Sequence, residues 1–319
     1  MLLKELSEDE LENDSWDDFI YGSNGGTIFH KRKFLDYHEN KFKDKERFLV
    51  FEKKSKIFGV IPLAIIKENG VLKAKSPYGG SYGGFIFREP LKYAESKEVV
   101  RLLKDYLLVN EVEEAYFTFP LSCCYRSYSN TFDFVMLEEG FELVNQDISS
   151  VVDLSRDIDT SMGSRPKRML KKALKLGVMI ENNVSVDEFY PLVEKTFAKH
   201  GVNATHTKDE LQVLKKKFTE EVRFNVAYYN GVPVSGLGCF SMNNLVDCSF
   251  YIVGDSDYNF TQASSLLIYN TLLESKADGY LYFDFGTSTS NMKVRENIFE
   301  FKEGFGALGY FRSTYKWRA

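Results

Sequence analysis

Two stretches of the chain repeat the same pattern of strands and turns, and this repeat constrains the fold more than any other feature. The first begins at Arg47 and the second at Arg223, and each reads as three strands joined by short turns. The turns contain Asn-Gly or Asn-Asn pairs, which tolerate the positive φ of tight hairpins: Asn69-Gly70, Asn230-Gly231 and Asn243-Asn244. Each half of the chain is therefore expected to contain an antiparallel meander.

The segments that follow the two meanders also repeat in order. Each meander leads to a helical stretch, then to an aromatic strand, and then to a Glu-Gly-Phe tripeptide that we interpret as the turn and strand closing each sheet. These segments are 95–110, 115–119 and 139–141 in the first copy, and 261–277, 280–285 and 303–305 in the second. Two such units predict an α+β (mixed α/β) chain with a mostly antiparallel sheet in each half.

The boundary between the units is expected in the polar stretch from Asp153 to Ser164, which lacks apolar periodicity. This places a first domain at residues 1–155 and a second domain at residues 156–319.

The second unit opens with three helices whose ends can be recognised. The first starts near Ser164 and stops at Gly177, a residue type that favours helix termination. The other two begin at capping boxes, in which a Ser or Thr is followed three residues later by Glu; these are Ser185–Glu188 and Thr207–Glu210.

Composition excludes several classes of protein. The apolar run at 58–66 has the length of a strand rather than of a membrane span, and the acidic N-terminus is unlike a signal peptide, so we expect a cytoplasmic protein. A formal net charge of −5 argues against DNA binding and against general coating of nucleic acid, although a local basic patch is compatible with it. The four cysteines have no zinc-ligand spacing, so no metal is expected.

The second hairpin of the second meander predicts how its residues face one another. A two-residue turn at Asn243-Asn244 would place Cys239 opposite Cys248 on the core face, as packed thiols rather than a disulfide. The other face would carry the pairs Gly236–Tyr251, Gly238–Ser249 and Phe240–Asp247. Glycines inside a strand allow either a ligand or a tightly packed helix to approach, and we leave both interpretations open. Tyr251, Ser249 and Asp247 would line that approach.

Several motifs, taken in order, resemble a known family. They are Ser76-Pro-Tyr-Gly-Gly-Ser-Tyr-Gly-Gly84, the helix 164–177, Lys199-His-Gly-Val-Asn-Ala-Thr-His206, Phe283-Asp-Phe-Gly286 and Phe301-Lys-Glu-Gly-Phe-Gly306. Their order over nearly the full length resembles the tandem N-acyltransferase (GNAT) fold of the FemAB-like family, close to the branch that accompanies polysaccharide biosynthesis. The resemblance implies two tandem GNAT-like domains, with the donor site in the second, and acetyl-CoA or another acyl-CoA as donor.

The resemblance also implies where the donor binds. Its pyrophosphate would lie on the amides that start the helix after the second meander, where the helix dipole favours anions. The cofactor-binding candidates are therefore Thr261, Gln262, Ala263, Ser264 and Ser265. This stretch lacks the glycines usual in the family's loop, and ordinary helix capping by Thr261 explains the same residues.

Three residues are candidates for catalysis. Asp284 lies between aromatic residues on an expected central strand, where a carboxylate is costly unless it is paired or functional, so it is either the base that receives the amine proton or a structural hydrogen-bond acceptor. Lys302 is implied by the resemblance to lie near the acceptor or the leaving group; the alternative is a solvated lysine on an edge strand. Tyr251, beside the strand glycines, is the third.

The acceptor-binding candidates are spread over both units. Arg165 and Arg168 near the start of a basic helix suit an anionic acceptor, while His200 and His206 lie in a loop and favour substrate contact or loop structure over a metal site. The glycine-rich stretch contributes candidates that suit a close approach to a ligand or a sugar ring. These are Tyr78, Gly79, Gly80 and Tyr82, together with Asp247 and Ser249 on the second hairpin.

Three functions remain from the sequence. The first is an acyl-CoA-dependent N-acyltransferase acting on an amino sugar or related precursor of a surface polysaccharide. This acceptor would be a small molecule, a nucleotide-linked sugar or a lipid-linked sugar. A lipid-linked acceptor would bring the protein into peripheral contact with a membrane. The second is aminoacyl transfer from charged tRNA to a peptidoglycan precursor, although the long helical hairpin frequent in such relatives is missing. The third is a non-catalytic binding protein that has kept only the fold.

Overall fold

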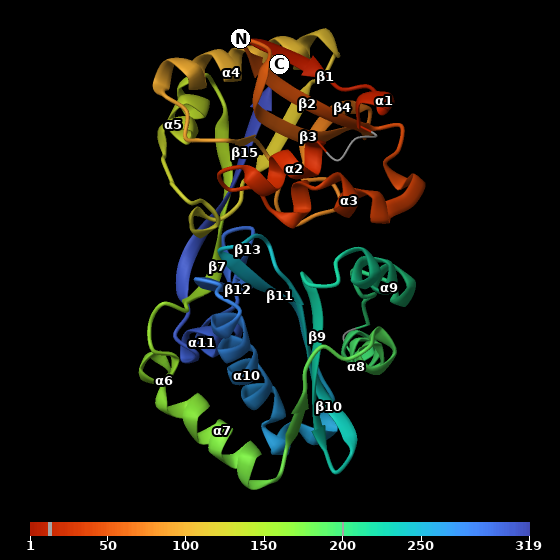
Figure 1. Cartoon of the computed structure of the whole chain (residues 1–319), viewed down its shortest axis with the longest axis vertical. Helices are drawn as coiled ribbons and strands as arrows, with labels where there is room; N and C mark the ends of the chain where they lie inside the picture. Colours follow the sequence, from red (N-terminus) through yellow and green to blue (C-terminus); the bar gives the residue numbers. More distant parts are fainter. Residues whose placement is uncertain (12–14, 200) are drawn as a thin grey trace. The chain divides into compact units, whose positions relative to one another are not determined.

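The structure is a computed structural model, which describes residues 1–11, 15–199 and 201–319. The chain forms two compact units, shown in Figure 1. Unit 1 contains residues 1–147 and 311–319, and unit 2 contains residues 148–310. The sequence-based boundary at 155/156 differs from the observed division mainly at the C-terminal end. In the structure, the last nine residues belong to unit 1.

Unit 1 contains a sheet in the order β1-β2-β3-β4-β6-β15, with β5 paired to β3. The strands are β1 (Leu2–Glu5), β2 (Glu46–Lys53), β3 (Lys56–Glu68), β4 (Val71–Ser76), β5 (Ile86–Phe87), β6 (Glu114–Thr118) and β15 (Leu308–Arg318). The helices are α1 (Glu8–Leu11), α2 (Ser15–Gly22), α3 (Arg32–Leu35), α4 (Tyr93–Val109) and α5 (Thr131–Glu138). The predicted meander is β2-β3-β4, and its core includes apolar residues of α4.

Unit 2 contains a sheet in the order β7-β12-β11-β10-β9-β8. The strands are β7 (Glu142–Asp153), β8 (Met179–Glu181), β9 (Val222–Tyr229), β10 (Val232–Phe240), β11 (Val246–Gly254) and β12 (Tyr282–Thr287). The first of them, β7, begins in unit 1. Two further strands, β13 (Thr289–Ser290) and β14 (Lys293–Val294), form a separate hairpin. The helices are α6 (Ile158–Ser161), α7 (Ser164–Lys175), α8 (Val186–Lys199), α9 (Lys208–Lys217), α10 (Ala263–Ala277) and α11 (Glu296–Gly304). The second meander, β9-β10-β11, is therefore confirmed.

The internal repeat is confirmed in its pairing pattern as well as in its order. In each unit the third strand of the meander is followed by a helix and then by a strand that runs parallel to it: β4 pairs with β6 in unit 1, and β11 pairs with β12 in unit 2. The interpretation of the Glu-Gly-Phe tripeptide is wrong in one respect. It ends a helix, α5 or α11, and the strand that follows does not close the sheet of its own unit: β7 pairs with β12 of unit 2, and β15 pairs with β6 of unit 1.

The predicted helix ends in unit 2 are also confirmed. α7 stops just before Gly177, whose φ is +76°. The Ser185 hydroxyl and the Glu188 carboxylate hydrogen-bond at the start of α8, and Thr207 and Glu210 form a complete capping box at α9. These local signals work because the side chains satisfy backbone amides that the helix itself leaves unpaired.

The sheet of unit 2 is covered on both faces, as Figure 1 shows, with α8 on one side and α10 on the other. Leu237 and Cys239 of β10 belong to the core that includes α10. Gly236 faces α8, because a Cβ built on it would lie 2.8 Å from the ring of Phe189. Of the two interpretations left open for the strand glycines, close packing by a helix is the one observed here.

Candidate active site

The centre of unit 2 is the point where its two parallel strands stop pairing. The ladder between β11 and β12 runs from Val246 opposite Tyr282 to Cys248 opposite Asp284, and it ends there although both strands continue. Immediately afterwards β11 contains a bulge, since Tyr251 pairs with Gly238 but Ser249 pairs with the next residue, Cys239. A bulge bends a strand and re-aims its side chains. The geometry therefore separates two neighbouring strand edges in the middle of the sheet.

The hairpin register expected from the sequence is wrong. The turn is longer than two residues, because the Asn243 side chain accepts hydrogen bonds from the amides of Leu245 and Val246 and closes a wider loop. The wider turn shifts the pairing by one position, so that Cys239 faces Ser249 instead of Cys248, and the bulge adds a second, so that Tyr251 is opposite Gly238 instead of Gly236. Both thiols are free and buried, and burial raises their pKa values well above the usual range.

Ser249 occupies the position just past the end of the parallel ladder. Its side chain is 7% exposed, and its hydroxyl has no hydrogen-bond partner in the part of the chain that the structure describes. A buried hydroxyl without a partner is costly, and such groups often mark a site where a ligand or water completes the bonding. Ser249 was expected to contact substrate on the glycine face. The bulge instead places it on the same face as Cys239, towards α10.

Asp284 lies at the last paired position of β12 and is only 1% exposed. Its carboxylate accepts hydrogen bonds from the Ser149 hydroxyl at 2.6 Å and from the backbone N–H of Gly286 at 2.8 Å, and the Cys248 thiol lies 3.8 Å from its other oxygen. The bond from Gly286 is the structural contact that the alternative interpretation requires. Asp284 also lies where the two strands diverge, which is the position that a catalytic carboxylate would need. Its assignment as the base stays a prediction.

Lys302 lies in α11, so the alternative of a solvated lysine on an edge strand is wrong. The side chain is 5% exposed, and its ammonium donates hydrogen bonds to the carbonyl oxygens of Gly286, at 2.8 Å, and Thr287, at 3.0 Å. Burial lowers the pKa of Lys302 to about 8, against an opposing effect of the Asp284 carboxylate. The lysine therefore holds the end of β12 in place and puts a positive charge within electrostatic reach of Asp284.

Tyr251 and His206, predicted separately, are brought together. The backbone N–H of His206 donates to the tyrosine oxygen at 3.1 Å, and Nδ1 of His206 lies 2.8 Å from the same atom. Both side chains are buried, and burial raises the pKa of Tyr251 above its usual range. Rings of Phe240 and Phe250 pack against His206. The other histidine of this loop, His200, lies outside the described residues.

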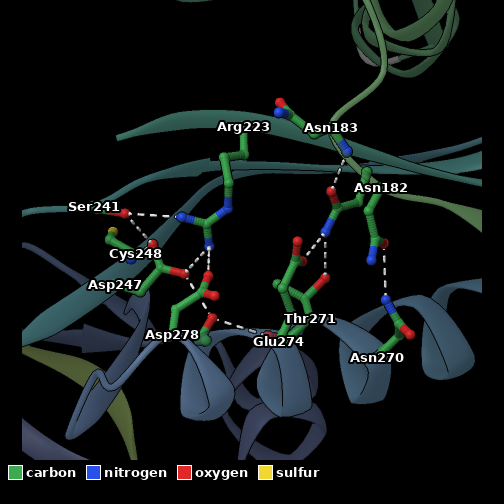
Figure 2. Close-up of polar contacts among 12 residues, drawn as sticks. Asn182, Asn183, Arg223, Ser241, Asp247, Cys248, Asn270, Thr271, Glu274 and Asp278 are labelled. Atoms are coloured by element: carbon green, nitrogen blue, oxygen red, sulfur yellow. Dashed lines mark hydrogen bonds and ion pairs between the residues drawn. The ribbon is translucent and has the colours of Figure 1, made fainter. Parts of the chain in front are cut away.

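Asp247 is not on the glycine face as expected. It is fully buried and forms an ion pair with Arg223 of β9 at 2.8 Å, which Figure 2 shows. The hydroxyls of Ser241 and Ser275 donate to the same carboxylate at 2.9 and 2.6 Å. These bonds tie β9, β10, β11 and α10 together. Because its carboxylate is already satisfied, Asp247 is better explained as a structural residue than as a contact for substrate.

The predicted donor loop forms a short 3₁₀ helix (Ser256–Thr261) followed by α10. Thr261 donates to the carbonyl of Tyr258 at 2.7 Å and accepts a bond from the N–H of Ala263 at 3.3 Å, but the N-cap of α10 is Gln262, whose side chain does not cap the helix. Gln262 adopts a left-handed conformation with φ +60°. The hydroxyl of Ser264 lies 2.8 Å from that of Ser235, whereas the hydroxyl of Ser265 points to Met169, with 3.5 Å between oxygen and sulfur.

The remaining candidates lie at two further places. In unit 2, Arg165 and Arg168 are exposed on α7. In unit 1, Tyr78 and Tyr82 are buried, and Gly79 has φ +66° because its backbone passes against the ring of His38, whose Nε2 is 2.7 Å from its carbonyl oxygen. Gly80 packs beside Phe29. The glycine-rich stretch is therefore a tight internal passage of the chain.

Sequence reasoning missed the partners that organise the site. Ser149, Cys248 and Arg223 each contact a candidate residue but carry no local motif, since Ser149 lies 135 positions from Asp284. Only the order of strands in the sheet brings them together. Within the described ranges, no group of three or more His, Cys, Asp or Glu is arranged to hold a metal ion, and no helix is both long and apolar enough to cross a membrane.

Comparison with known proteins agrees with this geometry. Residues 164–302 match the acetyltransferase (GNAT) domain family. Among solved structures, FemX is similar over 100% of this chain and 98% of its own, with a TM-score of 0.74 and 10% identity. A tandem GNAT protein from the clavulanic acid biosynthesis pathway is similar over 99% and 98%, with a TM-score of 0.56 and 10% identity.

The C-terminal domain of a putative lysylphosphatidylglycerol synthetase from Agrobacterium fabrum is similar over 84% of this chain and 82% of its own, with a TM-score of 0.58 and 12% identity. No curated protein is significantly similar in sequence. Residues 164–302 are therefore similar to the GNAT acetyltransferase domain, and the whole chain shares its tandem fold with FemX and with the tandem GNAT protein.

Proposed function

We propose that unit 2 transfers an acyl group, acetyl in the first instance, from acyl-CoA to the amine of an amino sugar or related precursor of a surface polysaccharide. The observation that carries the proposal is the end of the β11–β12 ladder at Cys248 and Asp284. There, a buried carboxylate ends one strand's pairing, and the buried hydroxyl of Ser249, which has no partner within the described ranges, follows on the other strand.

The reaction needs groups that handle one proton and one developing negative charge. Acyl transfer forms a C–N bond, breaks the C–S bond of the thioester, takes a proton from the amine and gives one to the departing sulfur. We assign Asp284 as the group that accepts the amine proton, because its buried carboxylate lies where the β11–β12 ladder ends. The Ser249 hydroxyl, which has no partner among the described residues, lies on the opposite face of the sheet from Asp284, so we propose that it reaches the carbonyl oxygen that gains charge through the gap between β11 and β12. Bound acyl-CoA would supply the activated acyl group.

The start of α10 is the proposed place for the phosphates of the donor. A helix N-terminus carries positive partial charge and amides that lack intrahelical partners. Ser264 is half-buried at the second position of α10, and its neighbours Ala263 and Ser265 are small enough to let a ligand approach the backbone. The amide of Ala263 is weakly engaged by Thr261, at 3.3 Å, so a phosphate oxygen could compete for it.

An anionic acceptor, such as a nucleotide-linked or lipid-linked sugar, is proposed for two reasons. Lys302 places a buried positive charge close to Asp284, and Arg165 and Arg168 are exposed on the same unit. Guanidinium groups bind phosphate and carboxylate in a bidentate manner. In unit 1, the ring of Tyr82 is covered by Arg312 at 5.4 Å, so its contribution to sugar binding would require that contact to open.

Likeness to FemX favours a second candidate, aminoacyl transfer from charged tRNA to a peptidoglycan precursor. A third, a binding protein without activity, rests on the missing glycines before α10. Addition of acetyl-CoA should raise the melting temperature of the full chain by mass action, by several degrees at saturating ligand. If no acyl-CoA shifts the melting temperature and aminoacyl-tRNA binds, the second candidate is favoured. Binding of acyl-CoA without turnover on any amine would favour the third.

A further inference from the structure

Helix α7 carries an unusual surface charge. Its twelve residues include six basic side chains and no acidic one, in a chain whose formal net charge is −5. The basic residues are Arg165, Lys167, Arg168, Lys171, Lys172 and Lys175. At 100° per residue they fall on one continuous face, because the buried residues Pro166, Leu170 and Ala173 occupy the opposite one. The face therefore concentrates positive charge in a way that the whole chain does not.

The basic residues of α7 also lack the acidic partners that basic residues of α4 have. None of the six forms an ion pair with another residue in the described parts of the chain. On α4, by contrast, Lys97 pairs with Glu138 and Glu139, and Arg101 pairs with Asp105. An ordinary solvated helix face mixes its charges in that way.

One acidic group near this face is Asp157. Lys167 is one of the charges that lower the pKa of Asp157, after the larger effect of hydrogen bonds from Thr160. Asp157 already caps α6, so its carboxylate is engaged there. The basic face of α7 thus keeps a large excess of positive charge.

The opposite side of α7 is firmly attached to the body of unit 2. Pro166 packs against α11, where a Cβ built on Gly304 would lie 3.0 Å from its ring, and Met169 accepts a hydrogen bond from Ser265 of α10. Figure 1 shows α7 on the outer side of α10, away from the sheet of the unit. The basic face is therefore held in one orientation and turned away from the core of its own unit.

One large apolar side chain lies at the edge of the same surface. Leu174 of α7 is 58% exposed, and at 100° per residue it falls beside Lys167. Basic residues around exposed apolar ones are typical of helices that lie at a membrane interface, where lysines bind lipid phosphates and the apolar groups enter the acyl boundary. A nucleic acid would use the charges but would leave Leu174 in water.

We propose that the basic face of α7, with Leu174, docks unit 2 onto a membrane surface that contains anionic phospholipid. The proposal stands apart from the acyl-transfer site, because none of the six basic residues is needed for chemistry in it except the two arginines proposed for the acceptor. Each lysine near an anionic surface is worth about a five-fold change in partitioning. Several together give reversible binding that falls as salt is added.

The test is co-sedimentation of the full chain with vesicles, either of phosphatidylcholine alone or of phosphatidylcholine with phosphatidylglycerol. The test variant is Lys167→Gln/Lys171→Gln/Lys175→Gln, which spares both arginines and keeps helix propensity. The matched control, Lys56→Gln/Lys67→Gln/Lys216→Gln, removes the same charge from exposed lysines elsewhere. We expect the wild type and the control to bind only the anionic vesicles, the control somewhat more weakly, and the test variant to bind about 100-fold more weakly than the wild type.

A second variant, Leu174→Ser, should weaken binding at high salt, where the apolar contribution remains. Acetyl transfer by the lysine variant in the absence of vesicles should stay at the wild-type level, which separates docking from catalysis. Equal binding to neutral vesicles, equal loss in the test and control variants, or binding of transfer RNA to this face without binding to vesicles would each overturn the proposal.

Discussion

The hydroxyl of Ser149 donates a 2.6 Å hydrogen bond to the carboxylate of Asp284, across 135 positions of sequence. Together with the amide of Gly286 it fixes the orientation of a carboxylate that is almost fully buried. The relationship ties the strand that enters unit 2 first, β7, to the strand that carries the proposed base. It makes the effects of two substitutions, one at each end of the bond, distinguishable.

We predict that Asp284→Asn lowers kcat by about 100-fold or more, because an amide cannot take the amine proton. Ser149→Ala keeps the carboxylate and should chiefly reduce the free energy of unfolding, by about 1 kcal/mol. Release of free thiol from acetyl-CoA measures the first effect, and urea denaturation measures the second. A wild-type kcat for Asp284→Asn would leave Asp284 with a structural role only.

Ser249→Ala should separate function from stability. Its buried hydroxyl has no partner in the portion of the chain that the structure describes, so its removal should leave the free energy of unfolding unchanged or raise it, by up to about 1 kcal/mol. Turnover should fall about 10-fold or more if the hydroxyl stabilises the developing oxyanion. Ser149→Ala is the matched control, since there the same substitution removes a real hydrogen bond. If Ser249→Ala loses stability and keeps its turnover, the hydroxyl is bonded in solution and has no such role.

Lys302 should make stability depend on pH in a direction set by its pKa. Burial lowers the folded-state pKa to about 8 from the usual 10.5, so the unfolded chain binds the extra proton between these values. The contribution of Lys302 to stability is therefore unfavourable below about pH 8 and is relieved as the pH rises towards 10.5. Lys302→Met lacks this effect. The difference in unfolding free energy between wild type and variant should thus grow in favour of wild type over that interval; a constant difference contradicts the assignment.

The Arg223–Asp247 pair should be structural. Asp247→Asn leaves a buried guanidinium without its counter-charge and is expected to cost about 3 kcal/mol or more. The KM values of the fraction that remains folded should not change, because the carboxylate faces Arg223 and two serines rather than a substrate (Figure 2). Thermal unfolding and kinetics on the same preparation measure both. A raised KM with unchanged stability would return Asp247 to the list of substrate contacts.

Local patterns in the sequence were sufficient for the repeat and for the helix ends. Capping at Ser185 and Thr207 depends on neighbouring side chains and is visible in a short stretch, and the meanders follow from alternation and turn residues. The same local patterns were not sufficient for the register of the second hairpin, because the Asn243 side chain closes a wider turn than the residue pair alone suggests. A shift of two residues keeps the faces of the strand, which is why Tyr251 still lies with the glycines.

The longer-range features depend on sheet order, which no short stretch contains. The return of the last strand to unit 1 is an example: Thr314 to Arg318 of β15 pair with β6, whereas the boundary drawn from polarity assigned them to the second domain. The bulge at Tyr251 and Ser249 is another. Its effect, to turn Ser249 towards α10, reverses the face that strict alternation predicts.

The central claim is that acyl-CoA binds at the start of α10, and titration calorimetry with acetyl-CoA tests it most directly. Ser264→Asp puts a negative charge where the phosphates would lie, while an acid in the first turn of a helix favours folding. Ser164→Asp, at the exposed start of α7, is the matched control. The account predicts saturable binding by wild type and Ser164→Asp, and none by a normally folded Ser264→Asp. Absence of binding by wild type, or equal binding by all three, would contradict it.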